Sequence, residues 1–264
     1  MSQHEMVEYD IADGIATIAL NRPKSLNAMT PELMGELKQT VLDAEGDPSV
    51  RALIITGRGR AFSSGGDKQF LNELLGMRPQ QIKSTVYANF QGAIKAVKLC
   101  AKPTIAAVNG GAVGAGCELT LACDFRVAAD NAYFLESWVH LGIIAPLGGM
   151  SLLPQLIGLG RATEMLMLGE RVTAARAQEI GLVRNVVAAE CLDEETRTLA
   201  KTLAAGPPLA YAAFKQGLRR GAESNLSAEW EANLHVQALL IDSADFREAV
   251  VALGEKRAPT FDGR

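Results

Sequence analysis

The chain has 264 residues, of which 48% are hydrophobic and 21% are charged, and this composition is typical of a folded protein with a sizeable core. Its formal net charge of −4 argues against a protein that binds nucleic acid by neutralising many phosphates. No apolar run approaches the length of a membrane-spanning helix.

Targeting and metal sites are also not expected. The segment from Met1 to Asp10 is polar and acidic, unlike a signal or transit peptide, so we expect a cytoplasmic protein. The four cysteines have no CxxC spacing and too low a density for a disulfide scaffold, which indicates reduced thiols. With only three histidines, we expect no metal site. No nucleic-acid partner and no membrane association are expected either.

The first two thirds of the chain alternate strand and helix patterns. Short β-branched apolar runs predict strands at 14–20, 51–57, 103–110 and 125–130. Thr30 followed by Pro31 predicts the start of a helix that ends near Gly46, and a second helical segment covers about 80–99. Strands that alternate with helices predict an α/β fold with a parallel sheet.

From about Val172 the pattern becomes helical, and after Cys191 it is nearly all helix. Leu226, Trp230, Leu234 and Ile241 form a stripe at helical spacing, which is typical of a core or a subunit contact. We place a boundary near residue 195, with an α/β core over 1–195 and a helical region over 196–264.

Three glycine-bearing stretches follow strand-like runs, at 57–67, 109–118 and 141–149. Loops at the carboxyl ends of parallel strands are where α/β proteins place ligands, and glycine lets a ligand approach the backbone. The second stretch leads into an apolar segment that contains one carboxylate, Glu118. A buried carboxylate is costly, so Glu118 must reach solvent, find a partner or perform chemistry.

Five blocks of the sequence together resemble the enoyl-CoA hydratase/isomerase, or crotonase, family, in that family's order and spacing. They are "LNRPKSLNAM" (20–29), "GRAFSSGGD" (59–67), "KPTIAAVNGGAVGAGCELTLACDFRVA" (102–128), "LGIIAPLGG" (141–149) and "FREAVVALGEKRAPTF" (246–261). The resemblance implies a crotonase-like spiral of ββα units with a helical C-terminal region, an acyl-CoA substrate and a homotrimer or hexamer. It implies no cofactor, since coenzyme A is part of the substrate.

Carried over block by block, the resemblance assigns the catalytic groups. The backbone N–H groups of Gly66 and Ala115 match an oxyanion hole that holds the thioester carbonyl, and Glu118 matches a catalytic acid/base one turn further along. Backbone donors suit this role because they are fixed before the reaction. A carboxylate in an apolar wall has a raised pKa, which suits proton transfer near neutrality.

One position departs from the family pattern. Hydratases with two carboxylates carry a second Glu four residues before the Gly that corresponds to Gly142, and Trp138 stands there. Glu136 and His140 flank it and are the alternative candidates for a second acid/base. If the segment is helical, they lie one turn apart on one face. Trp138, Phe70 and Leu74 are candidates for the lining of the acyl pocket.

The coenzyme A contacts implied by the family fall on three segments. Lys and Arg suit phosphate oxygens, although a solvated charged surface explains each residue taken alone equally well. The candidates are Arg22, Lys24 and Leu26 in the first loop, Ser64, Gly65, Asp67 and Lys68 in the second, and Lys256 and Arg257 near the C-terminus.

The leading hypothesis is therefore an enzyme that stabilises a thioester enolate, most simply an enoyl-CoA hydratase. Because the second Glu is absent, an enoyl-CoA isomerase or a crotonase-type hydrolase is the alternative. An acyl-CoA-binding protein with little turnover is a third hypothesis, and the intact Glu118 argues against it.

Overall fold

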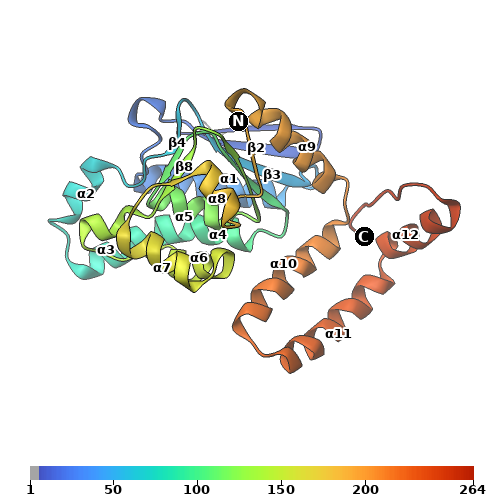
Figure 1. Cartoon of the computed structure of the whole chain (residues 1–264). Coiled ribbons are helices and arrows are strands. Elements are labelled where there is room, and N and C mark those ends of the chain that lie inside the picture. The colour runs from blue at the N-terminus through green and yellow to red at the C-terminus, as the bar shows by residue number, and fades with distance from the viewer. Residues whose placement is uncertain (1–5) are drawn as a thin grey trace.

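The computed structural model describes residues 6–264 and contains two sheets surrounded by helices (Figure 1). The larger sheet has the order β1-β2-β3-β5-β7-β10, in which only the β1–β2 pair is antiparallel. Its strands are β1 (Val7–Ala12), β2 (Ile15–Leu20), β3 (Ala52–Gly57), β5 (Thr104–Val108), β7 (Phe125–Ala129) and β10 (Asn185–Val187). The four strands predicted from β-branched runs are all in this sheet.

The smaller sheet has the order β4-β6-β8-β9 and is built from very short strands. They are β4 (Ala61–Ser63), β6 (Gly111–Val113), β8 (Tyr133–Leu135) and β9 (Val172–Thr173). Successive pairs, β3–β4, β5–β6 and β7–β8, each place one strand in each sheet, and a helical segment then leads to the next pair. This repetition is the expected spiral of ββα units.

Helix α1 (Pro31–Gly46) illustrates how the sequence sets the outer layer. The Thr30 hydroxyl accepts a hydrogen bond from the Leu33 N–H at 3.3 Å, and Pro31 needs no hydrogen-bond acceptor in the first turn. The predicted segment 80–99 forms α3 (Pro79–Val86), a π-helical turn η2 (Tyr87–Gln91) and α4 (Gly92–Leu99). Helix α2 (Lys68–Leu74) begins directly after the first glycine-bearing stretch, and α5 (Ala115–Ala122) begins within the second.

The remaining core helices cover the lower and upper faces in Figure 1. They are α6 (Gly149–Ile157), α7 (Leu159–Leu168), α8 (Ala174–Glu179) and α9 (Leu192–Ala204). Helix α9 buries Leu192, Ala200 and Leu203 against the larger sheet. The boundary expected near residue 195 therefore falls inside a core helix, and the helices that leave the core start at Pro208 instead.

The C-terminal arm, by which we mean α10 (Pro208–Glu223), α11 (Leu226–Asp242) and α12 (Ala244–Glu255), projects to one side of the core (Figure 1). Its best-buried attachment is Lys215, whose Nζ lies 2.6 Å from Asp124 Oδ2 and donates to the Lys102 carbonyl at 2.9 Å. Helices α10 and α11 contain no buried residue. Within residues 6–264 no helix is both long and apolar enough to cross a membrane.

Candidate active site

Two of the glycine-bearing stretches meet where the short strands β4 and β6 end. The strands are parallel neighbours, with Ala61 opposite Gly111 and Ser63 opposite Ala112. Gly65 has φ +87°, and a Cβ there would lie 2.7 Å from the Val113 carbonyl oxygen and 3.8 Å from the Ala115 nitrogen. Only glycine permits both this backbone conformation and this close approach.

The N–H groups of Gly66 and Ala115 are free to bind a ligand. Met29 N–H donates to the Gly65 carbonyl at 2.7 Å, and Asp67 N–H donates to the Met29 carbonyl at 2.9 Å. This pairing turns the N–H of Gly66 away from Met29. Ala115 is the first residue of α5, so its N–H has no acceptor within the helix. Within the described residues, neither N–H donates to a protein oxygen.

The carboxylate of Glu118 is buried one turn along α5 from Ala115 and is held at one oxygen only. Its Oε1 accepts hydrogen bonds from Leu147 N–H at 3.0 Å and Gly149 N–H at 2.6 Å, whereas Oε2 is buried and has no hydrogen-bond partner. A Cβ on Gly149 would lie 2.8 Å from Oε1, so only glycine fits there. One fixed oxygen and one free oxygen are what an acid/base needs to act on a bound substrate.

Burial, and after it the nearby charge of Glu136, raise the pKa of Glu118 to about 8, against the lowering effect of the two N–H donors. Burial likewise raises the pKa of Glu136 to about 7. Two carboxyl groups in one apolar region do not both ionise easily. Near neutral pH, Glu118 therefore exchanges a proton readily, which is the property that acid/base catalysis requires.

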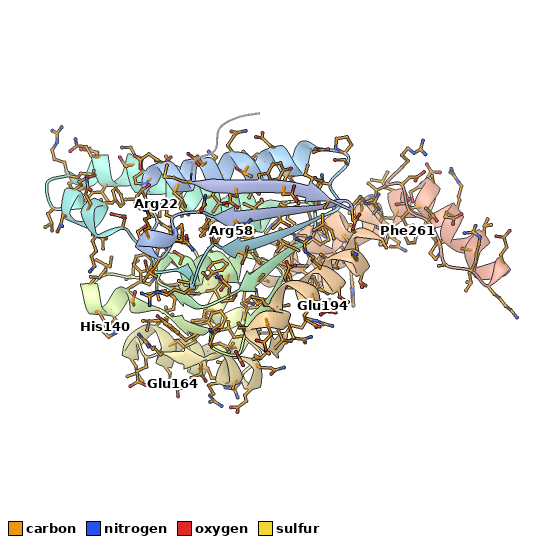
Figure 2. All side chains as sticks on the ribbon, turned by 90° about the horizontal axis from the view of Figure 1, so that it is seen from above. Arg22, Arg58, His140, Glu164, Glu194 and Phe261 are labelled. Carbon is orange, nitrogen blue, oxygen red and sulfur yellow. The ribbon has the colours of Figure 1, made fainter. Side chains whose placement is uncertain are left out.

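The structure separates the two candidates for a second acid/base. Ser137–Leu141 is a 3-10 helix (η3) that begins after Glu136, so Glu136 and His140 do not share a helical face as expected. Glu136 is fully buried near Glu118, whereas His140 is exposed and its Nε2 lies 2.8 Å from the Gly169 carbonyl oxygen. Figure 2 shows His140 at the outer rim of the molecule.

Aromatic side chains flank the two oxyanion candidates. Trp138 is half-buried, and its Cε2 and Cζ2 lie 3.8 Å from the position that a Cβ on Gly114 would occupy. In α2, Phe70 is buried and stacks on Phe90 of η2, with ring centroids 5.4 Å apart. Leu71, which was not among the predicted residues, also lies beside Gly66. A Cβ added to Gly66 would lie 3.5 Å from Leu71 Cδ2. Leu74 is half-buried against the same core.

The first two candidate coenzyme A segments are joined to each other. Arg22 Nη1 lies 3.0 Å from Asp67 Oδ2, and Ser64 N–H donates to the Leu26 carbonyl at 2.9 Å. Lys24 and Lys68 are exposed beside them. A pocket of about 500 Å³, lined by residues 21–25, opens at the same place.

Asn27 organises this loop and was missed by the sequence analysis. It is buried with φ +54°, its Oδ1 accepts from Arg22 N–H, and its Nδ2 donates to the carbonyls of Arg58 and Ala61 at 2.9 and 2.8 Å. Asparagine tolerates this left-handed conformation better than most residues. Its presence before a helix start in "SLNAM" is the only local pattern that points to it.

The third candidate segment does not meet the other two within one chain. Lys256 and Arg257 follow α12 on the arm, and Figure 2 shows Phe261 at the opposite end of the molecule from Arg22. Arg257 is already paired, with Nη1 2.6 Å from Glu248 Oε1 and Nε 2.7 Å from Glu255 Oε2.

A separate hollow of about 540 Å³ lies between α6 and α10 and is lined by residues such as Leu152, Phe214 and Leu218. Neither Glu118 nor the two oxyanion candidates line it. The hollow therefore belongs to the joint between core and arm and not to the catalytic group.

Known proteins resemble this chain over its whole length in sequence and in structure. The family model described as enoyl-CoA hydratase/isomerase matches residues 10–264. A probable enoyl-CoA hydratase from Rhodobacter capsulatus is 36% identical over all of both chains. The 1,2-epoxyphenylacetyl-CoA isomerase of Escherichia coli is 33% identical over 98% of this chain and 99% of its own. The crystal structure of a putative enoyl-CoA hydratase from Streptomyces coelicolor A3(2) superposes with a TM-score of 0.95 at 38% identity, covering 100% of this chain and 96% of the other.

Proposed function

The chain belongs to the enoyl-CoA hydratase/isomerase family, and from this premise we propose that it hydrates a 2-enoyl-CoA, with Glu118 as its acid/base. Membership of the family itself establishes that the chain is an enzyme that acts on acyl-CoA thioesters as a hydratase or an isomerase. The observation that supports the finer proposal is the half-held carboxylate of Glu118 beside two free backbone N–H groups.

In the proposed reaction the thioester carbonyl oxygen accepts hydrogen bonds from Gly66 N–H and Ala115 N–H. Water adds to the β-carbon while the electron pair of the double bond moves toward that oxygen as an enolate, and the free oxygen of Glu118 takes the proton of the water. Glu118 then gives a proton to the α-carbon, which yields a 3-hydroxyacyl-CoA. Donors fixed before the reaction stabilise the enolate without reorganisation.

Isomerisation is the second candidate, and Trp138 is the observation that favours it. An indole does not transfer protons near neutral pH, so no carboxylate stands at the family's second position. One base can remove a proton from the α-carbon of a 3-enoyl thioester and return it to the γ-carbon of the resulting dienolate, which gives the 2-enoyl thioester. The two relatives named above are nearly equally similar to this chain, so similarity alone does not choose between hydration and isomerisation.

A panel of acyl-CoA substrates tests the proposal. Purified enzyme is incubated with 2-enoyl-CoA and 3-enoyl-CoA thioesters of several chain lengths, and the products are identified by mass and chromatography. A product heavier by one water supports hydration, and a product of unchanged mass supports isomerisation. Release of free coenzyme A indicates a hydrolase, and tight binding without turnover indicates an acyl-CoA-binding protein.

The oxyanion hole has its own test, because proline or bulky substitutions at Gly66 or Ala115 also strain the backbone. The carbonyl stretching frequency of a bound, unreactive thioester analogue reports hydrogen bonding directly. We expect a shift to lower frequency relative to the analogue in water. A frequency equal to that in water contradicts the assignment of Gly66 and Ala115.

The proposal also includes assembly into a homotrimer or hexamer. Apolar side chains are exposed both on the arm and on the core around η3 and α7, at separate places on the molecule. A ring of identical chains closes when one surface of each copy binds a different, complementary surface of the next copy. Lys256 and Arg257 then approach the coenzyme A site of another copy. Light scattering after gel filtration measures the mass.

Two further expectations belong to the same proposal. Turnover requires no cofactor beyond the coenzyme A of the substrate, so dialysis against a chelator leaves activity unchanged. A cytoplasmic location is supported by the four cysteines, all free thiols within the described residues. Cell fractionation measures it.

A further inference from the structure

Glu136 is a buried carboxylate that the proposed reaction does not use. It follows β8 and continues the alternation of that strand, since Phe134 and Glu136 are buried while Tyr133 and Leu135 are half-buried. Its side chain therefore points inward, toward α5. Both of its oxygens are buried and have no hydrogen-bond partner.

Two donors lie beside this carboxylate without being aligned to it. The Cys117 thiol and the Trp138 indole are near enough to lower the pKa of Glu136, against the larger effect of burial. The indole Nε1 is itself buried without a hydrogen-bond partner. Buried polar groups left in this state are costly, so their grouping in one place next to a catalytic residue calls for a function.

Glu136 meets α5 on a different side from the backbone donors that hold Glu118. Successive residues of a helix project about 100° apart, so Cys117 and Glu118 face different directions. Cys117 faces Glu136, whereas Glu118 is held by Leu147 and Gly149 from the α6 side. Glu136 thus lies behind the catalytic helix, close enough for its charge to act on Glu118.

The tryptophan next to it borders the oxyanion hole. Gly114 N–H donates to the Leu135 carbonyl at 2.8 Å, which joins the end of β8 to the residue just before Ala115. The six-membered side of the Trp138 ring lies against Gly114. A change at Glu136 is therefore expected to affect both the Trp138 ring and the first residues of α5.

We propose that Glu136 is a positioning residue, whose sealed carboxylate lies behind the Trp138 indole at the border of the oxyanion hole and acts by its charge on the indole and on Glu118, without contacting the substrate. This inference rests on the proposed role of Glu118. Of the titratable groups on α5, Cys117 faces Glu136 and Glu118 lies within reach of its charge, whereas His140 of η3 is turned toward Gly169.

The first experiment is the pH dependence of kcat/KM in Glu136→Gln, which keeps the shape and removes the charge. Since the Glu136 charge raises the pKa of Glu118, its removal moves the rising limb assigned to Glu118 to lower pH. Activity on the high-pH plateau stays within about tenfold, whereas a catalytic acid/base is worth ~10²–10⁴-fold. A loss as large as that of Glu118→Gln, or an unshifted limb, overturns the proposal.

The second experiment needs no turnover and so separates this inference from the proposed function. The chain has two tryptophans, and Trp230→Phe leaves Trp138 as the sole fluorophore. We expect Trp138 emission to change as pH rises through neutrality, and Glu136→Gln to abolish that change. In Trp230→Phe/Glu118→Gln the midpoint moves to lower pH, because one of two repelling carboxylates is gone. Emission that is constant with pH, or an unmoved midpoint, overturns the proposal even if Glu136→Gln does not fold.

Discussion

Helix α5 and the C-terminal arm are both rich in apolar residues, yet they end in opposite environments. All eight residues of α5 are buried, including Glu118, while α10 and α11 have no buried residue. In α11, Trp230 is 66% exposed and Leu234 is 71% exposed. Apolar side chains on a helix require a partner surface. For α5 the chain supplies that surface itself, and for the arm it does not.

This difference in burial indicates that the α5 region carries the chemistry and that the arm serves assembly. Around α5 the polar groups are few and fixed by the backbone, as with the Glu118 oxygen held by Leu147 and Gly149. On the outer helices of the arm, ion pairs such as Arg247 with Asp242 are exposed, with side chains that are 67% and 86% accessible. Substitutions in the two regions are therefore expected to change different measurements.

The largest expected effect is on catalysis, from Glu118→Gln. The amide keeps the volume and the hydrogen bonds to Oε1 but accepts no proton, so kcat falls by ~10²–10⁴-fold. Binding of a substrate analogue, measured by calorimetry, stays close to that of the wild type. Activity within a few-fold of the wild type would show that another group is the acid/base.

The next effect is on stability and compares one arginine of the core with one of the arm. Arg126 is buried and donates to the carbonyls of Leu182, Thr120 and Cys123 at 2.6, 3.1 and 2.8 Å. Arg126→Met leaves these carbonyls without donors, so the free energy of unfolding falls by roughly 2–5 kcal/mol. The matched change Arg247→Met breaks only an exposed pair and leaves the unfolding midpoint in urea unchanged. Equal losses for both variants contradict the comparison.

A third substitution tests the arm itself. Leu234→Asp puts a charge on the exposed apolar stripe of α11, so we expect the mass in solution to fall from the assembled to the single-chain value. His235→Asp adds the same charge one residue away, on a different face of the same helix, and is the control. Light scattering measures both. An unchanged mass in Leu234→Asp, or an equal fall in the control, contradicts an interface on this stripe.

The sequence predicted well what local pattern determines. The β-branched runs placed β2, β3, β5 and β7, and the Thr30 cap placed the start of α1. The short strands β4 and β6 lie inside stretches that read as glycine loops, because three residues are too few for a periodic pattern. The boundary expected near residue 195 falls inside α9 for a related reason: a local pattern indicates a helix but not the surface against which it packs, and the tertiary contacts of α9 join it to the core.

The residues that hold the candidate site together were less predictable. Glu118, Gly66 and Ala115 were assigned through family blocks, and their roles stay predictions. The donors to Glu118 come from 29 and 31 residues away. The burial of Glu136 and the exposure of His140 depend on a 3-10 turn that no local pattern indicates. Contacts between distant segments set these features.

The smallest expected effect is a change in the free energy of unfolding with pH. It again distinguishes the α5 region from the arm. Glu118 and Glu136 have raised pKa values in the folded chain, about 8 and about 7 against an ordinary value of about 4.5. Between those values the folded chain binds protons that the unfolded chain has released. The free energy of unfolding therefore falls as pH rises from about 4.5 to 8.

On the arm, Arg257 lowers the pKa of Glu248 to about 2, so this carboxylate is ionised in both states across the same range and contributes no slope. We expect the thermal midpoint to fall from pH 5 to pH 8 in the wild type and in Glu248→Gln, and to fall much less in Glu118→Gln/Glu136→Gln. Scans at fixed protein concentration measure it, since assembly also shifts the midpoint. A wild-type slope that survives unchanged in the double variant would mean that other groups carry it and that the two buried carboxyls are not protonated near neutrality.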